Sequence, residues 1–456
     1  MAKNKNGSAN SAGNTNASSS VDELLLAALE RGDDSFETGR YLVTFKDGAG
    51  DQGLQSLGTQ GMRVADARDF EGQAATLENI GDADAVVFPE IGVALIGGNA
   101  AQERSMGAQM EIASDSPIEI IEPEHFVFAE QFFREAAYLS ATKTNGNGSN
   151  GGGVNEYLRG FLEATDTITK HLQHGKGYTE VDELDEETMV LGATWGLNVC
   201  KVPPSLRSGL GIRVAVLDTG FNIGHPDFVG RPVIGATFVG QPVQDLHSHG
   251  THCIGTACGP KSPAGTTPRY GIGYRSSIFA GKVLSNTGSS VGGSVLAGMN
   301  WAIANRCPVI SMSLGGTGGV QAAYTAAGQA ALNNGCLIIA AAGNSSGPTG
   351  FPANSPTIMS VASLDMSLSP SSFSNFGKVE IAAPGRDVFS SAPMPRRYTT
   401  MSGTSMATPH VAGCAALWAE TSPNMRGLTL WRRLQASARR LPFSTARVGA
   451  GLVQAP

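Results

Sequence analysis

The feature that most constrains the fold is a series of short, continuous apolar runs in the second half of the chain. The runs are rich in Val, Ile, Leu and Ala, and Ala-rich stretches of helical character separate them. They cover residues 213–217, 277–284, 309–314, 337–342 and 358–362. Continuous apolar strands separated by helices are typical of a parallel sheet that is covered on both faces. Residues 189–456 are therefore predicted to form an α/β domain, a parallel sheet flanked by helices.

Charge is divided unevenly along the chain. The net charge of the 456 residues is −7, but residues 1–188 hold 13 Lys and Arg against 32 Asp and Glu, whereas residues 189–456 hold 19 against 7. An acidic half joined to a basic half predicts that one covers the other through electrostatic complementarity. Compositional drift is the alternative, because most basic residues of the second half are arginines.

Composition also excludes two classes of protein. A hydrophobic content of 41% is enough for a large core and excludes disorder of the whole chain. No apolar run approaches the ~18 residues that cross a bilayer, so no membrane span is expected. Residues 21–30 read as a short amphipathic helix and lack the order of a secretory signal. We therefore expect a cytoplasmic protein, or one exported by a route without a recognisable signal peptide.

The first half divides into three segments. Residues 1–20 are rich in Asn, Ser and Gly and are expected to be disordered. Residues 21–130 mix short strands with helical stretches and predict a small α+β domain. Residues 131–188 predict a linker, because a Gly- and Asn-rich piece, a helical stretch and an acidic run follow one another there.

Reactive side chains lie where functional residues of a parallel α/β sheet gather, beyond the strand ends. Asp218 ends an apolar run, His249 opens a helical stretch, and Ser405 lies in a Gly-Thr-Ser turn before the apolar helix 411–419. Taken singly, the Asp reads as a turn residue and the Ser as a helix N-cap. A zinc site formed by the nearby histidines with Cys253 and Cys258 is disfavoured, because so many groups on one helical segment cannot converge on one ion.

The joint pattern resembles the subtilisin family of serine proteases. The motifs that carry the resemblance are VAVLDTG (214–220), HGTHCIGT (249–256), SLGG (313–316), AAAGN (340–344) and GTSMATPH (403–410). The resemblance covers about residues 195–454. It implies a subtilisin-like fold and a serine endopeptidase that hydrolyses peptide bonds. Residues 41–130 also resemble the inhibitory propeptide domain of such proteases.

Each residue type in this pattern has a chemical task. A Ser405 hydroxyl needs a base within hydrogen-bond reach, and His249 would take its proton and return it to the leaving amine. The resemblance selects His249 because the family's catalytic His is the first of the HGTH pair, which leaves His252 a structural role. Asp218 would fix the His tautomer and stabilise the imidazolium. The Asn344 amide and the Ser405 N–H would form the oxyanion hole.

The substrate is expected to be a polypeptide that lies as an extended strand along two segments of the domain. These segments contain the expected substrate-binding residues Ser289, Gly292, Ser313, Leu314, Gly315 and Gly316. Main-chain pairing of this kind tolerates many sequences. Because few acidic residues occur in this half, a broad preference for apolar or aromatic residues is expected rather than strict cleavage after basic ones.

No catalytic cofactor is expected, and no metal site is assigned. Many family members bind structural calcium, and Asp227 matches a frequent calcium ligand, but the loop 259–271 offers no Asn or Asp cluster. All six cysteines lie in the basic half and are expected to be free thiols. Cys253 directly follows HGTH, as in the proteinase K branch, where a thiol lies beneath the catalytic His. This feature predicts inhibition by mercurials.

A long insert separates Glu130 from Trp195, and it predicts how the enzyme is controlled. We expect the chain's own acidic N-terminal segment to inhibit the protease until cleavage near Tyr138 or Met189. Three other functions stay open. They are a peptide ligase or macrocyclase on the same triad, an inactive protease-like binding scaffold, which the complete set of catalytic residues disfavours, and nucleic-acid binding. No nucleic-acid partner is expected, because the basic residues are scattered and no recognition motif is present.

Overall fold

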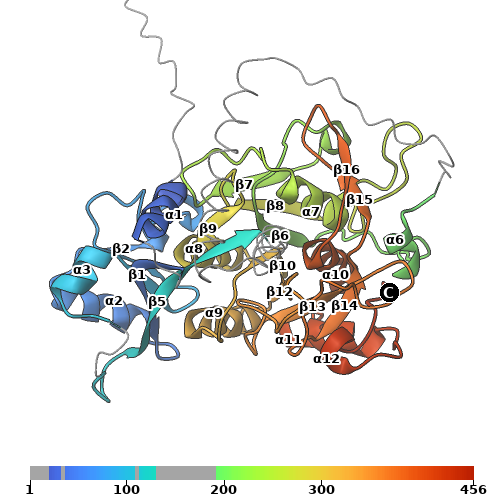
Figure 1. Ribbon diagram of the computed structural model, residues 1–456. Helices are drawn as coiled ribbons and strands as arrows, with labels where there is room; N and C mark the ends of the chain where they lie inside the picture. Colours follow the sequence, from blue (N-terminus) through green and yellow to red (C-terminus); the bar gives the residue numbers. More distant parts are fainter. Residues whose placement is uncertain (1–19, 32–35, 108–111, 130–191) are drawn as a thin grey trace, which may run out of the picture.

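The computed structural model describes residues 20–31, 36–107, 112–129 and 192–456 (Figure 1). Almost all of the expected N-terminal disordered segment and the whole expected linker 131–188 lie outside these residues. The expected processing positions Tyr138 and Met189 also lie outside them. The described chain forms two units, a small one up to residue 129 and a larger one from residue 192, and a single long strand connects them.

The larger unit is built on a seven-stranded sheet in which every pair is parallel. In spatial order its strands are β14 (Ile381–Pro384), β13 (Met359–Leu364), β12 (Leu337–Ala341), β10 (Val309–Met312), β6 (Arg213–Asp218), β8 (Ser277–Lys282) and β7 (Val233–Thr237). Each apolar run of the sequence overlaps one of these strands, so the predicted parallel sheet is confirmed. The two edge strands were not foreseen, because β7 is half exposed and β14 is only four residues long.

Helices cover both faces of this sheet, which explains the continuous apolar character of its strands. On β6, Val214 and Val216 point into a core shared with α7 (His249–Cys258) and α10 (Thr404–Ala419). The alternate residues Ala215 and Leu217 point into a second core shared with α8 (Gly292–Ala304) and α9 (Ala322–Asn333). The remaining elements are α6 (Trp195–Val199), η3 (Pro226–Phe228), α11 (Gly427–Ser437), α12 (Thr445–Val448) and the strand pair β15 (Val388–Ser391) and β16 (Tyr398–Met401). No helix in the described part of the chain combines the length and the apolar character needed to cross a membrane.

The smaller unit is a mixed sheet with two of its helices packed on one face. Its strands are β1 (Glu37–Phe45), β2 (Val64–Asp66), β3 (Ala85–Phe88), β4 (Val93–Ile96) and β5 (Ile118–Ala129), in the order β5-β1-β4-β3-β2. Its helices are α1 (Ser20–Arg31), α2 (Gly50–Thr59), η1 (Ala67–Asp69), η2 (Glu71–Gln73) and α3 (Gly98–Glu103). Phe45, Leu57 and Ala101 share a core between the sheet and its helices. Leu42 and Leu95 point the other way, into the core that contains α8 and α9.

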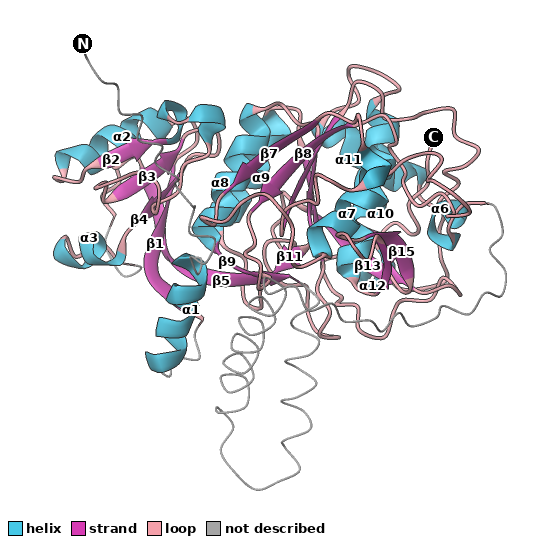
Figure 2. Cartoon of the chain, turned by 90° about the horizontal axis from the view of Figure 1, so that it is seen from above, coloured by secondary structure: helices cyan, strands magenta, loops and turns pink. Residues whose placement is uncertain are grey.

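Strand β5 leaves its own sheet and enters the larger unit, as Figure 2 shows. There it lies between β9 (Ser289–Val291) and β11 (Leu314–Gly315) and is antiparallel to both. Phe128 is paired with Ser289 on one side and Gly315 on the other, and Ala129 is paired with Leu314. The last residues of β5, called the tail strand below (residues 126–129), therefore form the middle of a three-stranded arrangement.

Carboxylates of the acidic half contact the beginnings of two helices in the basic half. Glu122 accepts hydrogen bonds from the N–H groups of Ala322 (3.1 Å) and Ala323 (2.7 Å) at the start of α9. Glu124, which is fully buried, accepts from the N–H of Gly293 (2.6 Å) at the start of α8. Helix N-termini carry partial positive charge, so these contacts are electrostatically favourable. The acidic groups thus meet backbone N–H groups here, rather than the Lys or Arg side chains that the charge division suggests.

Candidate active site

Asp218 and His249 meet at the carboxyl end of β6. Asp218 is the last residue of this strand and His249 the first residue of α7, and both are buried. The His249 Nδ1 atom lies 2.7 Å from Asp218 Oδ1, which also accepts a hydrogen bond from the Thr219 N–H (2.8 Å). Burial lowers the pKa of His249, but the Asp218 carboxylate outweighs it, so the pKa is raised above its usual value.

Ser405 lies beside this pair, near the start of α10. The chain runs through Gly403, the residue before the helix, and Ser405 is its second residue. Its hydroxyl donates to the Ser313 carbonyl (3.2 Å), and the Ser313 hydroxyl in turn donates to the Ser405 carbonyl (2.8 Å). The His249 Nε2 atom is buried and has no hydrogen-bond partner among the described residues. The structure therefore brings the serine into the same site as His249 without a hydrogen bond between them, a looseness common in enzymes without bound substrate.

Asn344 follows β12 and points its amide toward the start of α10. Its Oδ1 accepts from the N–H (2.8 Å) and the hydroxyl (3.0 Å) of Thr404, and these two bonds set the orientation of the amide. A Cβ on Gly403 would lie 3.3 Å from Asn344 Nδ2 and 3.6 Å from the Ser405 N atom. Two N–H groups thus lie near the same point, and only a residue without a side chain leaves that point open.

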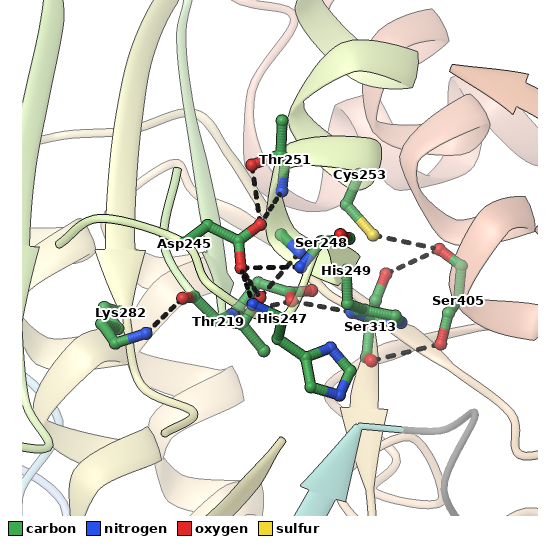
Figure 3. Close-up of polar contacts among 12 residues, drawn as sticks. Thr219, Asp245, His247, Ser248, His249, Thr251, Cys253, Lys282, Ser313 and Ser405 are labelled. Carbon is green, nitrogen blue, oxygen red and sulfur yellow. Dashed lines mark hydrogen bonds and ion pairs between the residues drawn. The ribbon is translucent and has the colours of Figure 1, made fainter. Parts of the chain in front are cut away.

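A buried acid, Asp245, connects the elements that carry Asp218 and His249 (Figure 3). Its carboxylate accepts five hydrogen bonds, from the Thr219 hydroxyl (3.0 Å), the N–H groups of His247 (2.9 Å) and Ser248 (3.0 Å), and the N–H (2.9 Å) and hydroxyl (2.6 Å) of Thr251. It therefore caps the start of α7 and fixes the residue next to Asp218. Sequence reasoning missed Asp245, and its place four residues before the HGTH motif was the available signal.

Close approach of α7 to the strand end explains the glycine of HGTH. The Gly250 N–H donates to the Thr219 hydroxyl (2.8 Å), and a Cβ at this position would lie 2.3 Å from the Gly220 carbonyl oxygen. Lys282 is the last residue of β8, and its buried ammonium donates a hydrogen bond to the Thr219 carbonyl, next to Asp218. Burial lowers the pKa of Lys282 to about 8, although the Asp245 and Asp218 carboxylates oppose this shift.

The two other histidines of the segment are buried and favour the neutral form. Burial lowers the pKa of His252 to about 3 and that of His247 to about 4, the second also because His249 lies close by. His252 Nε2 lies 2.9 Å from the Val388 carbonyl oxygen, so this contact connects α7 to β15. His252 therefore bonds to β15, whereas the histidine that bonds to Asp218 is His249.

Cys253 lies beneath His249 and its thiol contacts the Ser405 carbonyl at 3.6 Å. Among the described residues, Asp218, His249 and Cys253 form the only group whose potential metal-ligand atoms lie within 4.8 Å of one another. Burial raises the pKa of the Cys253 thiol well above its usual value. All six cysteines are buried free thiols.

Three of the six expected substrate-binding residues pair with the tail strand. Ser289, Leu314 and Gly315 pair with it, whereas Ser313 contacts Ser405. Gly316 lines a small cavity together with Asn344, and Gly292 lies at the start of α8, where a Cβ would lie 3.4 Å from Glu124 Cγ.

The neighbourhood of Asp227 does not fit a calcium ion. Its buried carboxylate accepts hydrogen bonds from the Tyr270 hydroxyl (2.7 Å), the Tyr398 hydroxyl (2.9 Å) and the Arg397 guanidinium (3.0 Å). A guanidinium and two hydroxyl donors leave no set of oxygen acceptors of the kind that calcium requires. Arg397 supplies the positive charge at this position.

Comparison with known proteins identifies the family. The model of the subtilase family, Peptidase_S8, matches residues 209–451, more than half of the chain. The chain belongs to the subtilase family. This subtilase is 35% identical over 322 residues to subtilisin amylosacchariticus of Bacillus subtilis subsp. amylosacchariticus, an alignment that covers 66% of this chain and 82% of that protein. It is 36% identical over 301 residues to an alkaline protease of Alkalihalobacillus alcalophilus, covering 64% and 77% of the two chains.

A solved structure agrees with this assignment. The crystal structure of a cold adapted subtilisin-like serine proteinase superposes with a TM-score of 0.52 at 34% identity, covering 58% of this chain and 99% of that chain. The predicted subtilisin-like α/β fold is thus confirmed. As a subtilase, the protein is a serine-type endopeptidase, a class that needs no catalytic cofactor.

Proposed function

We propose that this subtilase hydrolyses peptide bonds through an acyl-enzyme on Ser405 and is made as a precursor that residues 20–129 inhibit. One observation carries the proposal. The tail strand lies antiparallel between β9 and β11, where an extended peptide substrate would lie, and its last residue pairs with Leu314, the neighbour of Ser313, which contacts Ser405. The Ala129 N–H donates to the Gly288 carbonyl (2.7 Å), which extends the pairing to the end of the strand.

Three side chains divide the reaction between them. His249, held by Asp218 at 2.7 Å, accepts the Ser405 proton as the hydroxyl attacks the scissile carbonyl, and then donates this proton to the leaving amine. Water hydrolyses the acyl-enzyme by the same route in reverse. The carboxylate of Asp218 favours the imidazolium that forms in each step, which is the direction in which it shifts the pKa of His249.

The oxygen of the tetrahedral intermediate receives hydrogen bonds from the Asn344 amide and the Ser405 N–H. Thr404 orients the amide before substrate arrives, so the donors need no reorganisation during the reaction. No catalytic cofactor takes part. Hydrolysis is favoured over ligation or macrocyclisation, because the relatives that the chain matches are a subtilisin and an alkaline protease.

The register of the tail strand supports a processing site close to Ala129. Ala129 pairs with Leu314, so the next position along an antiparallel partner faces Ser313, whose carbonyl contacts the Ser405 hydroxyl. Strands rise about 3.3 Å per residue, so a substrate in this register would carry Tyr138 about 30 Å beyond the strand end. We therefore propose a first cut within a few residues of Ala129, in place of one near Tyr138 or Met189.

The residues of the tail strand also indicate a cleavage preference. Phe126 and Phe128 are buried, and both pack in a cluster with Val239 and Val291 of the larger unit. Apolar neighbours of this kind favour substrates with apolar or aromatic residues before the scissile bond, because burial of such side chains stabilises the bound peptide.

The proposal is tested by intact mass and N-terminal sequencing of the purified chain beside Ser405→Ala. We expect the parent to lose an N-terminal acidic fragment ending just after Ala129, while Ser405→Ala stays at 47.1 kDa. Adding the processed parent to Ser405→Ala then separates cleavage within one molecule from cleavage between molecules. A fluorophosphonate should label the processed parent and not Ser405→Ala. A parent that stays uncut and unlabelled would contradict the proposal.

A further inference from the structure

Three hydroxyl groups at and just before the start of strand β9 converge on one carboxylate. Ser285, Thr287 and Ser289 each donate to Oδ1 of Asp22, at 3.1, 2.7 and 2.9 Å. Asp22 lies in the first turn of helix α1 and is buried despite its charge, with 8% of its surface exposed. We name these three residues the hydroxyl cradle.

The hydroxyl cradle is a compact group of donors. Its three oxygen atoms lie 2.6–3.0 Å from one another, so they form a closed triangle on the loop that leads into β9. Three hydroxyls can meet only part of one another's hydrogen-bonding capacity. An anionic acceptor can accept one hydrogen bond from each of them. The Lys282 ammonium lies behind the loop, bonded to Asn286 Oδ1 at 2.9 Å, and attracts Asp22 electrostatically. The site therefore has the chemistry of a carboxylate receptor.

Helix α1 also makes an apolar contact next to this polar one. Val21, Leu25 and Ala28 are buried and lie on one face of the helix, at positions i, i+4 and i+7. They belong to the same apolar cluster as Phe126 and Phe128 of the tail strand. Figures 1 and 2 both place α1 beside β9 and β5. The helix thus bonds to the enzyme through Asp22 and covers the tail strand through its apolar face.

We propose that the hydroxyl cradle is a carboxylate-binding site of the protease and that Asp22 is its ligand in the precursor, so that α1 is a latch that holds the tail strand in the groove. The proposal rests on the proposed function only where it assigns the latch a role in inhibition. Opening of the latch is a separate step from cleavage after the tail strand, because Asp22 and the processing site lie on different elements.

Hydrogen exchange on the full-length Ser405→Ala chain tests the contact without catalysis. Asp22→Asn removes the charge and Thr287→Val removes one hydroxyl at nearly constant shape. Each should speed exchange in α1 and β9 about ten- to hundredfold, as expected for loss of hydrogen bonds to a charged group. Asp47→Asn, at an exposed position between β1 and α2, is the matched control for charge and should leave these rates unchanged.

The double variant of Asp22→Asn and Thr287→Val decides whether the two residues act through one contact. Its exchange should be little faster than that of either single variant, because both changes break the same interaction. Unchanged exchange in Asp22→Asn, or fully multiplicative effects in the double variant, would overturn the latch. If Asp22→Asn on α1 and Thr287→Val on the protease speed exchange to a similar extent, a local folding defect of α1 is excluded as the cause.

The same changes in the active chain test the inhibitory role. Cleavage after the tail strand should keep its rate in Asp22→Asn, whereas protease activity should appear about ten- to hundredfold sooner after cleavage. If the parent is not cleaved at all, the proposed function fails while the exchange experiment still decides the latch. If cleavage occurs and activity appears at the parent's rate, the carboxylate contact exists without controlling the enzyme, and that part of the proposal is wrong.

Discussion

His252 should make this enzyme sensitive to acid, by an amount that the structure allows us to work out. Its ring is fully buried between α7 and β15, and burial lowers its pKa from an ordinary value of 6.5 to about 3. As the pH falls below 6.5, the unfolded chain therefore takes up a proton that the folded chain refuses. Stability is fully present above this pH and is lost as the pH falls toward 3.

The size of the effect follows from the two pKa values. At pH 5 the unfolded state is stabilised by about 2 kcal/mol through protonation of this histidine, because this pH lies 1.5 units below its ordinary pKa of 6.5. The folded state is stabilised hardly at all, because its pKa is about 3. Above pH 8 neither state is protonated at this position. The free energy of unfolding should thus fall by about 2 kcal/mol between pH 8 and pH 5 through His252 alone.

Urea unfolding of Ser405→Ala, with and without His252→Gln, measures this contribution in a chain that cannot digest itself. The amide of Gln can donate to the Val388 carbonyl but does not titrate. The difference between the two chains at pH 8 reports lost packing, and only its change with pH reports protonation. We expect His252→Gln to gain about 2 kcal/mol relative to its parent between pH 8 and pH 5. A difference that stays constant with pH would refute the reasoning.

Three further predictions concern the site and its surroundings. Asp218→Asn removes the charge that stabilises protonated His249, so kcat on a peptide substrate should fall by about 10⁴-fold, and a loss below tenfold would contradict the assigned role. Cys253→Ser should abolish inhibition by mercurials, and a variant that keeps full sensitivity would refute a reactive thiol beneath the site. Asp227→Asn should lower the midpoint of thermal unfolding equally in calcium and in EDTA, because Arg397 neutralises this carboxylate; a larger effect in calcium would indicate a bound metal.

Sequence patterns predicted the parallel sheet because its strands are continuous apolar runs with buried neighbours on both faces. They could not predict that β5 passes between β9 and β11, since this pairing joins residues more than 160 positions apart. An antiparallel edge of that kind depends on backbone groups, which every residue carries, and so leaves no pattern in the chain.

The same limit applies to the site. Asp218, His249, Asn344 and Ser405 could be found because each lies in a compact motif. Asp245 lies outside these motifs, and its five hydrogen-bond donors, three backbone N–H groups and two threonine hydroxyls, form no motif of their own, so only its place just before HGTH could have pointed to it. The match of Asp227 to a frequent calcium ligand likewise gave no sign that Arg397, 170 positions away, bonds to Asp227.

The contacts of Glu122 and Glu124 with the starts of α9 and α8 have a consequence for how the two units evolve. A helix start supplies the same N–H groups whatever its side chains are. At the start of α9 the protease can therefore change its sequence while Glu122 must stay. At the start of α8 a Cβ on Gly293 would lie 2.9 Å from Glu124 Oε1, so there the glycine must stay together with the glutamate. Sequences related to this one should keep the two glutamates without matching changes in the other unit. Methods that find contacts from correlated substitutions would then overlook this interface.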